Sequence, residues 1–333
     1  MRVLLGIDEN GLGPILGPLL VTGVAATVSD SGAAIVTKKT RGGLRARLGD
    51  SKRIVSFGDT AQGEAWARAI FASLGHEVAT PSALLDLALL NGRASFRSLC
   101  PKGHKEQCWP KEPEAFAAPQ EMLKKAHKDI EQLARRGIAL SWARSVIVCT
   151  KQLNTESRNG LSRFDTDLLA MEQLIMAARD SSATYMHVTC GKVGGYNRYD
   201  PHFRLLSKHL RTTVLESRAH STYAVPHVGE ISFVRDAEDA HMLVALASLI
   251  GKYFRDLFMA RVVRYQQRSL PDLPDVSGYH DPITRRFIEA SSLVRKRQKL
   301  PDDCFVRIKM VATDSKEASS TPRRSRVAPH RAD

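Results

Sequence analysis

Two apolar segments that flank an acidic pair and a glycine turn constrain this chain more than any other feature of its sequence. Residues 2–8 have the apolar character of a short buried strand, and Asp8 and Glu9 stand at its end. A turn rich in glycine and proline follows at residues 10–14, and residues 19–28 form a second apolar, β-type segment. The chain is therefore expected to place two neighbouring carboxylates at the end of a buried strand.

Strand and helix patterns alternate along the remainder of the chain. Apolar segments predict strands, and apolar residues at helical spacing predict helices. The expected strands are 139–149, 184–190 and 228–235, and the expected helices are 59–74, 120–136, 164–178 and 238–267. This order predicts an α/β fold in which a sheet is flanked by helices.

Two of the expected helices carry further signals. The 120–136 helix has Glu and Lys pairs typical of an exposed helix, and together with the polar segment that precedes it from about residue 100 it is expected to form an insertion. At the start of the expected 238–267 helix, Asp236 and Asp239 stand where an N-cap and a first-turn acid belong. Residues 313–333 are poor in apolar side chains, which predicts a disordered tail after a domain of residues 1–312.

The charge of the chain favours a polyanionic partner. Among 333 residues, 49 Lys and Arg against 35 Asp and Glu give a formal net charge of +14, which indicates nucleic acid first and an anionic membrane surface second. The surplus is largest in residues 251–300, whereas residues 151–250 are balanced. No apolar run approaches the roughly 20 residues of a membrane helix. Five sparse cysteines and a first apolar run too short for a secretory signal predict a cytoplasmic protein.

The acidic pair allows more than one interpretation. Two carboxylates buried at a strand end are costly without a compensating positive charge, which a divalent cation such as Mg²⁺ would supply. An ordinary turn-capping Asp8 beside a solvated Glu9 is the alternative. A dinucleotide-binding loop is disfavoured, because its glycines must open a helix, whereas Pro14 and Pro18 lead into a second strand.

Four blocks, in the same order, resemble the type 2 ribonucleases H (the ribonuclease HII and HIII family). They are Gly6-Ile7-Asp8-Glu9-Asn10-Gly11-Leu12-Gly13-Pro14, Asp50-Ser51-Lys52, Ala245-Leu246-Ala247-Ser248-Leu249-Ile250-Gly251-Lys252 with Arg255-Asp256, and Ser277-Gly278-Tyr279. The resemblance implies a ribonuclease H-like fold, a mixed β-sheet flanked by helices. It also implies endonucleolytic cleavage of RNA paired to DNA, or at ribonucleotides within a DNA duplex, with Mg²⁺ or Mn²⁺ in a two-metal site held by four carboxylates.

Carried over residue by residue, the resemblance assigns catalytic and metal-binding roles to Asp8, Glu9 and Glu238. Glu238 stands where the family has its fourth acid, an Asp, so the charge is kept on a longer side chain. The position of the third acid is Gly191, which has no side-chain ligand. Its neighbour Cys190 is too soft a ligand to replace a carboxylate on Mg²⁺.

The same resemblance implies contacts with nucleic acid. The residues concerned are Gly11, Leu12, Gly13, Lys52, Lys252, Arg255 and Tyr279. Leu12 departs from the family, which has a basic residue between the two glycines, so one phosphate contact is lost. The glycines still permit close backbone approach to a ribose 2′-OH, and Tyr279 is suited to stacking on a sugar or base.

The incomplete set of acids leaves other functions open. One is a catalytically impaired nucleic-acid-binding protein of the same fold, because loss of one ligand removes charge stabilisation. Another is a non-enzymatic basic scaffold that docks a protein through the 100–136 insertion. Asp236 or Asp239 could supply the fourth acid. A separate zinc-like spacing, for which a fourth ligand is not evident, is formed by Cys100, His104 and Cys108.

Overall fold

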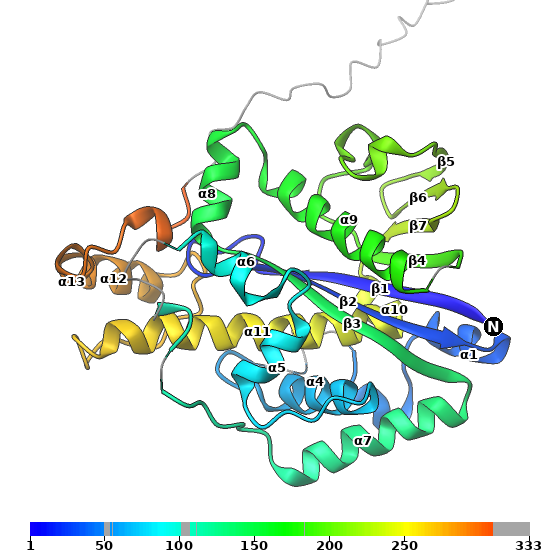
Figure 1. The fold of residues 1–333 in the computed structure, drawn as a ribbon, viewed down its shortest axis with the longest axis horizontal. Helices are drawn as coiled ribbons and strands as arrows, with labels where there is room; N and C mark the ends of the chain where they lie inside the picture. Colours follow the sequence, from blue (N-terminus) through cyan, green and yellow to red (C-terminus); the bar gives the residue numbers. More distant parts are fainter. Residues whose placement is uncertain (50–53, 55, 101–106, 111, 183, 309–333) are drawn as a thin grey trace, which may run out of the picture.

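A seven-stranded sheet forms the centre of the molecule in the computed structural model, which describes residues 1–333 except 50–53, 55, 101–106, 111, 183 and 309–333 (Figure 1). The strands lie in the order β3-β2-β1-β4-β7-β6-β5. Their bounds are β1 Arg2–Asn10, β2 Leu19–Val28, β3 Ile138–Val148, β4 Met186–Gly191, β5 Thr212–Glu216, β6 His220–Val225 and β7 Gly229–Val234.

The sheet is mixed. β1 runs parallel to β4, and β4 runs parallel to β7, while the other neighbouring pairs are antiparallel. β1 is therefore an interior strand covered on both faces, which explains why its sequence is a continuous apolar run. The expected fold class, α/β with a mixed sheet flanked by helices, is confirmed.

Helices cover both faces of the sheet (Figure 1). On one face α11 packs against β1 and β2 and α4 packs on α11, while α9 packs on the opposite face. The helices are α1 Asp30–Val36, α2 Gly42–Arg45, α4 Ala61–Ser73, α5 Pro81–Ala88, α6 Gly92–Ser98, α7 Gln120–Arg135, α8 Thr150–Arg158, α9 Arg163–Ser182, α10 Ala237–Ala240, α11 Met242–Gln267, α12 Pro282–Ala290 and α13 Ser292–Arg297. Short 3-10 turns are η2 Asp200–His202, η3 Leu206–Lys208 and η4 Asp302–Cys304.

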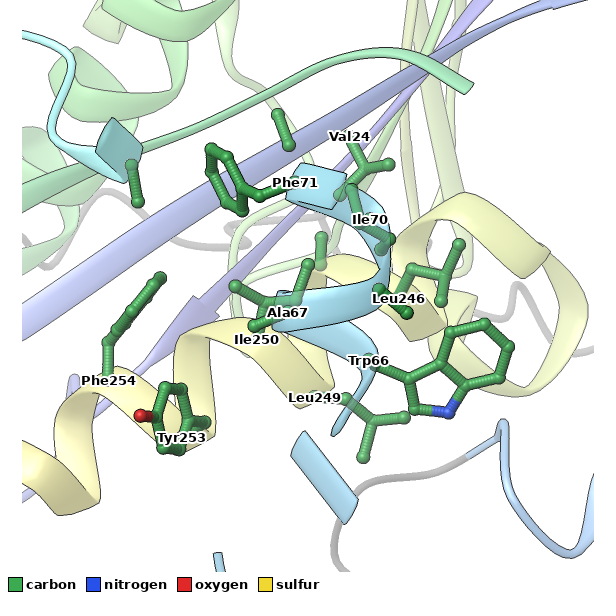
Figure 2. Packing of buried hydrophobic residues seen from close by; sticks show 14 of the residues in the cluster. Val24, Trp66, Ala67, Ile70, Phe71, Leu246, Leu249, Ile250, Tyr253 and Phe254 are labelled. Carbon is green, nitrogen blue, oxygen red and sulfur yellow. The ribbon is translucent and has the colours of Figure 1, made fainter. Parts of the chain in front are cut away.

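Buried apolar side chains hold α4 and α11 together beneath the sheet. Figure 2 shows Trp66 and Ile70 of α4 beside Leu246 and Ile250 of α11, with Val24 of β2 above them. All five side chains are almost completely buried. Burial of one such side chain contributes about 1.5–3 kcal/mol, so this layer anchors α11 firmly to the sheet.

α11 approaches the sheet very closely at Gly6 of β1. A Cβ atom at this position would lie 2.4 Å from backbone atoms of Leu243 and Val244, a distance that no side chain permits. The helix backbone therefore rests directly on the strand that carries Asp8 and Glu9.

The predicted helix over 238–267 is wrong in one respect, since the structure breaks it into α10 and α11. The break is at His241, whose backbone is extended with φ −133° and ψ 114°. Asp236 precedes α10 in the left-handed region (φ 53°) and its side chain makes no capping hydrogen bond, so its expected N-cap role is wrong as well.

The 120–136 helix is exposed on one side only, which corrects the expectation of an exposed helix. Leu123, Ala126, Ile130 and Leu133 of α7 are buried, and α7 packs against α4 and β3. None of the helices in the described ranges is long and apolar enough to span a membrane. The predicted tail lies outside the described residues, as do Asp50-Ser51-Lys52 and His104 of the zinc-like spacing.

Candidate functional site

A pocket of roughly 390 Å³, here called the β1 pocket, opens where β1 ends. Its walls come from the glycine turn, the end of β4, α10, α11 and the segment before α12. It brings together nine of the residues singled out from the sequence: Asp8, Glu9, Gly11, Leu12, Gly13, Glu238, Lys252, Arg255 and Tyr279. Lys52 lies outside the described residues. The fold thus unites segments more than 200 residues apart in the chain.

The carboxylates of Asp8 and Glu9 converge over Gly191. A Cβ atom on Gly191 would lie 2.7 Å from Asp8 Oδ1 and 3.7 Å from Glu9 Oε2. Gly191 ends β4, the parallel neighbour of β1. Because Gly191 has no side chain, the acids of β1 have room above the end of β4. Asp8 is only 8% exposed.

Gly191, the position that the resemblance assigns to a third acid, leaves space for the two carboxylates and offers no side-chain ligand of its own. Glu238 lines the same pocket from α10 and is half-buried, and its role as a third ligand remains a prediction. Within the described residues, no group of three or more His, Cys, Asp or Glu side chains is arranged to hold a metal ion. Two converging carboxylates nevertheless fit Mg²⁺, which is usually held by one or two carboxylates together with substrate phosphates and retained waters.

The glycine turn has a fixed backbone conformation. Gly11 has a φ of +90°, in the left-handed region that favours glycine, and a Cβ there would lie 2.6 Å from Nε of Arg255. The Arg307 guanidinium donates to the carbonyl oxygens of Gly11 at 2.6 Å and Gly17 at 2.7 and 2.9 Å. Arg163 donates to the Leu12 carbonyl at 3.2 Å. Burial lowers the pKa of Arg307 and of Arg163.

Tyr279 lies over the guanidinium group of Arg255. Arg255 Cζ is 5.0 Å from the ring centroid, and Nη2 donates to the Ser277 carbonyl at 2.8 Å. The side chain of Arg255 is almost fully buried, whereas Tyr279 is 49% exposed. Burial lowers the pKa of Arg255. The tyrosine ring is therefore the group presented at the pocket, and Arg255 supports it through a cation–π contact.

Two lysines bring positive charge to the β1 pocket. Lys252 Nζ lies 3.4 Å from Asp256, one turn along α11. Lys192, which the sequence did not single out, follows Gly191 and donates to Ser217 O at 2.8 Å and Ser221 Oγ at 2.7 Å. Burial lowers the pKa of Lys192.

Asp167 of α9 is a second feature that the sequence did not single out. Its side chain is fully buried, and in the described part of the chain neither carboxylate oxygen has a hydrogen-bond partner. Burial and then the negative charge of Asp8 raise its pKa well above the usual value. Asp167 therefore interacts electrostatically with Asp8 from the α9 side of the sheet.

Some of the residues near the site that were not expected from the sequence could have been found from its pattern, and others could not. Asp167 falls on the apolar stripe of its helix, between Phe164 and Met171 at helical spacing, so an acid at a core position could have been noticed. Arg163 and Arg307 leave none, because their partners are carbonyl groups some 150 and 300 residues away.

Among known proteins, the chain shows similarity to solved structures but to no family model or curated sequence. No protein-family model matches the chain, and no curated protein matches it. The chain is similar to Bst-RNase HIII crystallised with Mn²⁺, at 14% identity and a TM-score of 0.43, over 92% of this chain and 66% of that one. It therefore spans somewhat less than two thirds of that protein.

Two further solved structures are similar over most of the chain. RNase HII from Archaeoglobus fulgidus, in a complex with PCNA, shares 16% identity with a TM-score of 0.41, covering 96% of this chain and 98% of that chain. Aquifex aeolicus RNase H3 shares 14% identity with a TM-score of 0.42, covering 91% and 70%. These similarities concern the fold alone.

Proposed function

We propose that the protein is a metal-dependent endonuclease that cleaves an RNA/DNA hybrid or a duplex containing ribonucleotides. The observation that carries the proposal is the convergence of Asp8 and Glu9 over Gly191, inside a pocket that also contains the glycine turn and Tyr279. The preference for RNA-containing duplexes follows from the motifs that resemble type 2 ribonucleases H.

In this proposal Asp8 and Glu9 hold Mg²⁺ or Mn²⁺, with Glu238 as a third ligand. When bound, such a cation supplies Lewis-acid stabilisation of charge at the scissile phosphate. The chain itself keeps the two carboxylates close together, because the bare backbone of Gly191 leaves room for them. Asp8 is buried, and electrostatic interactions are stronger there because the effective dielectric constant is lower than in water.

The duplex is held by the remaining walls of the β1 pocket. Gly13 has open space where a side chain would stand, so a ribose can approach its backbone closely. At Gly11 the Arg255 side chain fills the corresponding space. Tyr279 provides an exposed ring for stacking on the sugar or base next to the scissile bond. Lys252 supplies positive charge toward the phosphate backbone.

A catalytically impaired nucleic-acid-binding protein is the second candidate, and Gly191 favours it. The walls of the β1 pocket that are proposed to hold the duplex would serve a protein that binds the duplex without cleaving it equally well. With two converging carboxylates and no group of three metal-binding side chains in the described ranges, the charge available for catalysis is smaller than in a site with four acids.

Cleavage and binding of a matched set of duplexes separate the two candidates. The set contains an all-DNA duplex, the same duplex with one ribonucleotide, and an RNA/DNA hybrid, each tested with Mg²⁺, with Mn²⁺ and with EDTA. The proposal predicts metal-dependent cutting at the ribonucleotide and in the hybrid, with the all-DNA duplex intact. Tight, salt-sensitive binding without cutting would assign the binding function. Equal cutting of all three duplexes would contradict the proposed specificity.

A further inference from the structure

A second pocket, here called the side pocket, lies between the segment after α1 and the end of α7, and its volume is roughly 620 Å³. Its floor is apolar and includes Met242 at the start of α11. Its charged lining residues are Lys38, Lys39, Arg41, Arg47, Arg136 and Asp129. Five positive charges against one negative charge make this pocket strongly basic.

Much of the positive charge in the side pocket faces solvent. The carboxylate of Asp129 forms an ion pair with Arg47, whose Nε and Nη2 each donate to it at 2.8 Å. Lys38, Arg41 and Arg136 are exposed, and no ion pair joins any of them to another described residue. The Arg47–Asp129 pair therefore stabilises the wall, while three cations remain available for a ligand.

The side pocket and the β1 pocket are neighbours. Lys39 lies 3.4 Å from Asp239 of α10, while the adjacent Glu238 lines the β1 pocket. Met242 at the side pocket and Ser248 at the β1 pocket are six residues apart on α11, about 9 Å along a helix.

We propose that the side pocket binds backbone phosphates of the same duplex whose scissile nucleotide lies in the β1 pocket. This inference rests on the proposed function. A duplex carries one negative charge per about 1.7 Å of its axis, so a span of 9 Å holds about five phosphates. Exposed Lys and Arg side chains are the usual partners of such phosphates. The Lys39–Asp239 ion pair brings the walls of the two pockets together, and this closeness favours nucleic acid over an acidic protein segment.

Two duplexes of equal length test the proposal, because the side pocket lies on only one side of the β1 pocket. One has its single ribonucleotide two base pairs from one end, and the other has it two base pairs from the opposite end. When the ribonucleotide occupies the β1 pocket, the long arm covers the side pocket in one duplex only. Binding is measured by fluorescence anisotropy across a series of salt concentrations, with Ca²⁺ in place of Mg²⁺ to limit cleavage.

The variant is Lys38→Ala/Arg41→Ala/Arg136→Ala, which leaves the Arg47–Asp129 pair intact. It should bind one duplex at least tenfold more weakly, with the slope of log K against log salt reduced by about 2–3, and bind the other like the wild type. The matched control is Lys124→Ala/Lys125→Ala/Lys128→Ala, which removes the same charge from the exposed side of α7. It should show no asymmetry.

Several outcomes would overturn the inference. Equal weakening for both duplexes would indicate non-specific attraction, and no weakening would show that phosphates do not reach the side pocket. Loss of binding to polyglutamate, with unchanged binding of both duplexes, would assign the pocket to an acidic protein segment. If the wild type bound neither duplex, the proposed function itself would fail first, so the two failures are distinguishable.

Discussion

At Gly191 the absence of a side chain gives the acidic pair its geometry. The space in which a Cβ atom would stand is within 2.7 Å of Asp8 Oδ1, and Gly191 does not have a positive φ. An alanine at this position is therefore acceptable to the backbone but displaces a carboxylate oxygen. The effect of such a change should appear at the site before it appears in stability.

Gly191→Ala should weaken Mn²⁺ binding by about tenfold or more, the usual scale for disturbing the support of a ligand. Its free energy of unfolding should change by less than about 1 kcal/mol, because only the end of a side chain has to move. Titration calorimetry and thermal unfolding give the two numbers. Gly194→Ala, which meets nothing within 4 Å, is the control. Unaltered Mn²⁺ affinity in Gly191→Ala would show that Asp8 is not a ligand.

Asp167 should make stability depend on pH. Its folded pKa is raised, so the folded chain holds its proton more tightly than the unfolded chain, whose Asp pKa is about 3.9. The destabilisation is absent below about pH 4 and grows as the pH rises toward the folded pKa. Asp167→Asn should therefore gain stability over the wild type at pH 8, by about 1.4 kcal/mol for each tenfold difference in proton affinity. Urea unfolding in EDTA at pH 4 and 8 measures this, and a gap that does not change with pH would refute it.

At the scale of elements, the contact between β1 and α11 positions the site. Gly6→Ala would drive a methyl group into the helix backbone, which cannot move aside as a side chain can. We expect a loss of about 2–4 kcal/mol, at or above the usual range for overpacking. Gly13→Ala, with open space around it, should be nearly neutral in stability. Urea unfolding gives the free energy of unfolding of both variants. Similar losses in the two variants would show that α11 does not rest on Gly6.

The break between α10 and α11 should respond to acid. His241 is buried there with Nδ1 unpartnered among the described residues, and burial lowers its pKa to about 4. The unfolded chain, with a His pKa near 6.5, binds more protons in this window, so stability is lost as the pH falls from about 6.5 to 4. The loss should be on the order of 3 kcal/mol.

His241→Gln tests this expectation, because glutamine keeps a polar side chain but does not titrate in this range. Its stability relative to the wild type should rise as the pH falls from 7 to 4, as measured by urea unfolding at each pH. A difference that stays constant over the window would mean that His241 is not held in its neutral form.

For the molecule as a whole, the sequence was informative wherever one segment decides the outcome. Residues 19–28 match β2 residue for residue, because a continuous apolar run in the middle of a sheet has few alternatives. The placement of Asp8 beside Gly11 follows in the same way, since both belong to one strand and turn. The acids, the glycine turn and Tyr279 do meet in one pocket.

The parts that escaped prediction depend on contacts between distant segments. Arg307 donates hydrogen bonds to the carbonyl groups of a turn almost 300 residues earlier in the chain, and no local sequence pattern predicts such a contact. The extended backbone at His241 interrupts a sequence whose helical periodicity runs through it. A buried, unpaired Asp167 is costly in a core, and its interaction with Asp8 becomes visible only when α9 packs on the face of the sheet opposite α11. Local rules fail here close to the candidate site, where functional requirements compete with stability.

The charge distribution of the whole molecule separates binding from cleavage. Its net charge of +14 supports attraction to a duplex at both pockets but does not contribute to the chemistry. In the proposed function, cleavage depends on the two carboxylates at the end of β1, so replacing them should abolish cleavage without loss of binding.

The most direct test is the single-turnover cleavage rate of a duplex with one ribonucleotide, at saturating protein and with Mn²⁺, for the wild type and Asp8→Asn. The account predicts cutting at the ribonucleotide by the wild type and a rate at least a hundredfold lower for the variant, comparable to loss of one transition-state-stabilising group, with the duplex still bound. Asp180→Asn, an exposed acid at the end of α9, should cut like the wild type. Equal cutting by Asp8→Asn, or no cutting by the wild type, would contradict the account.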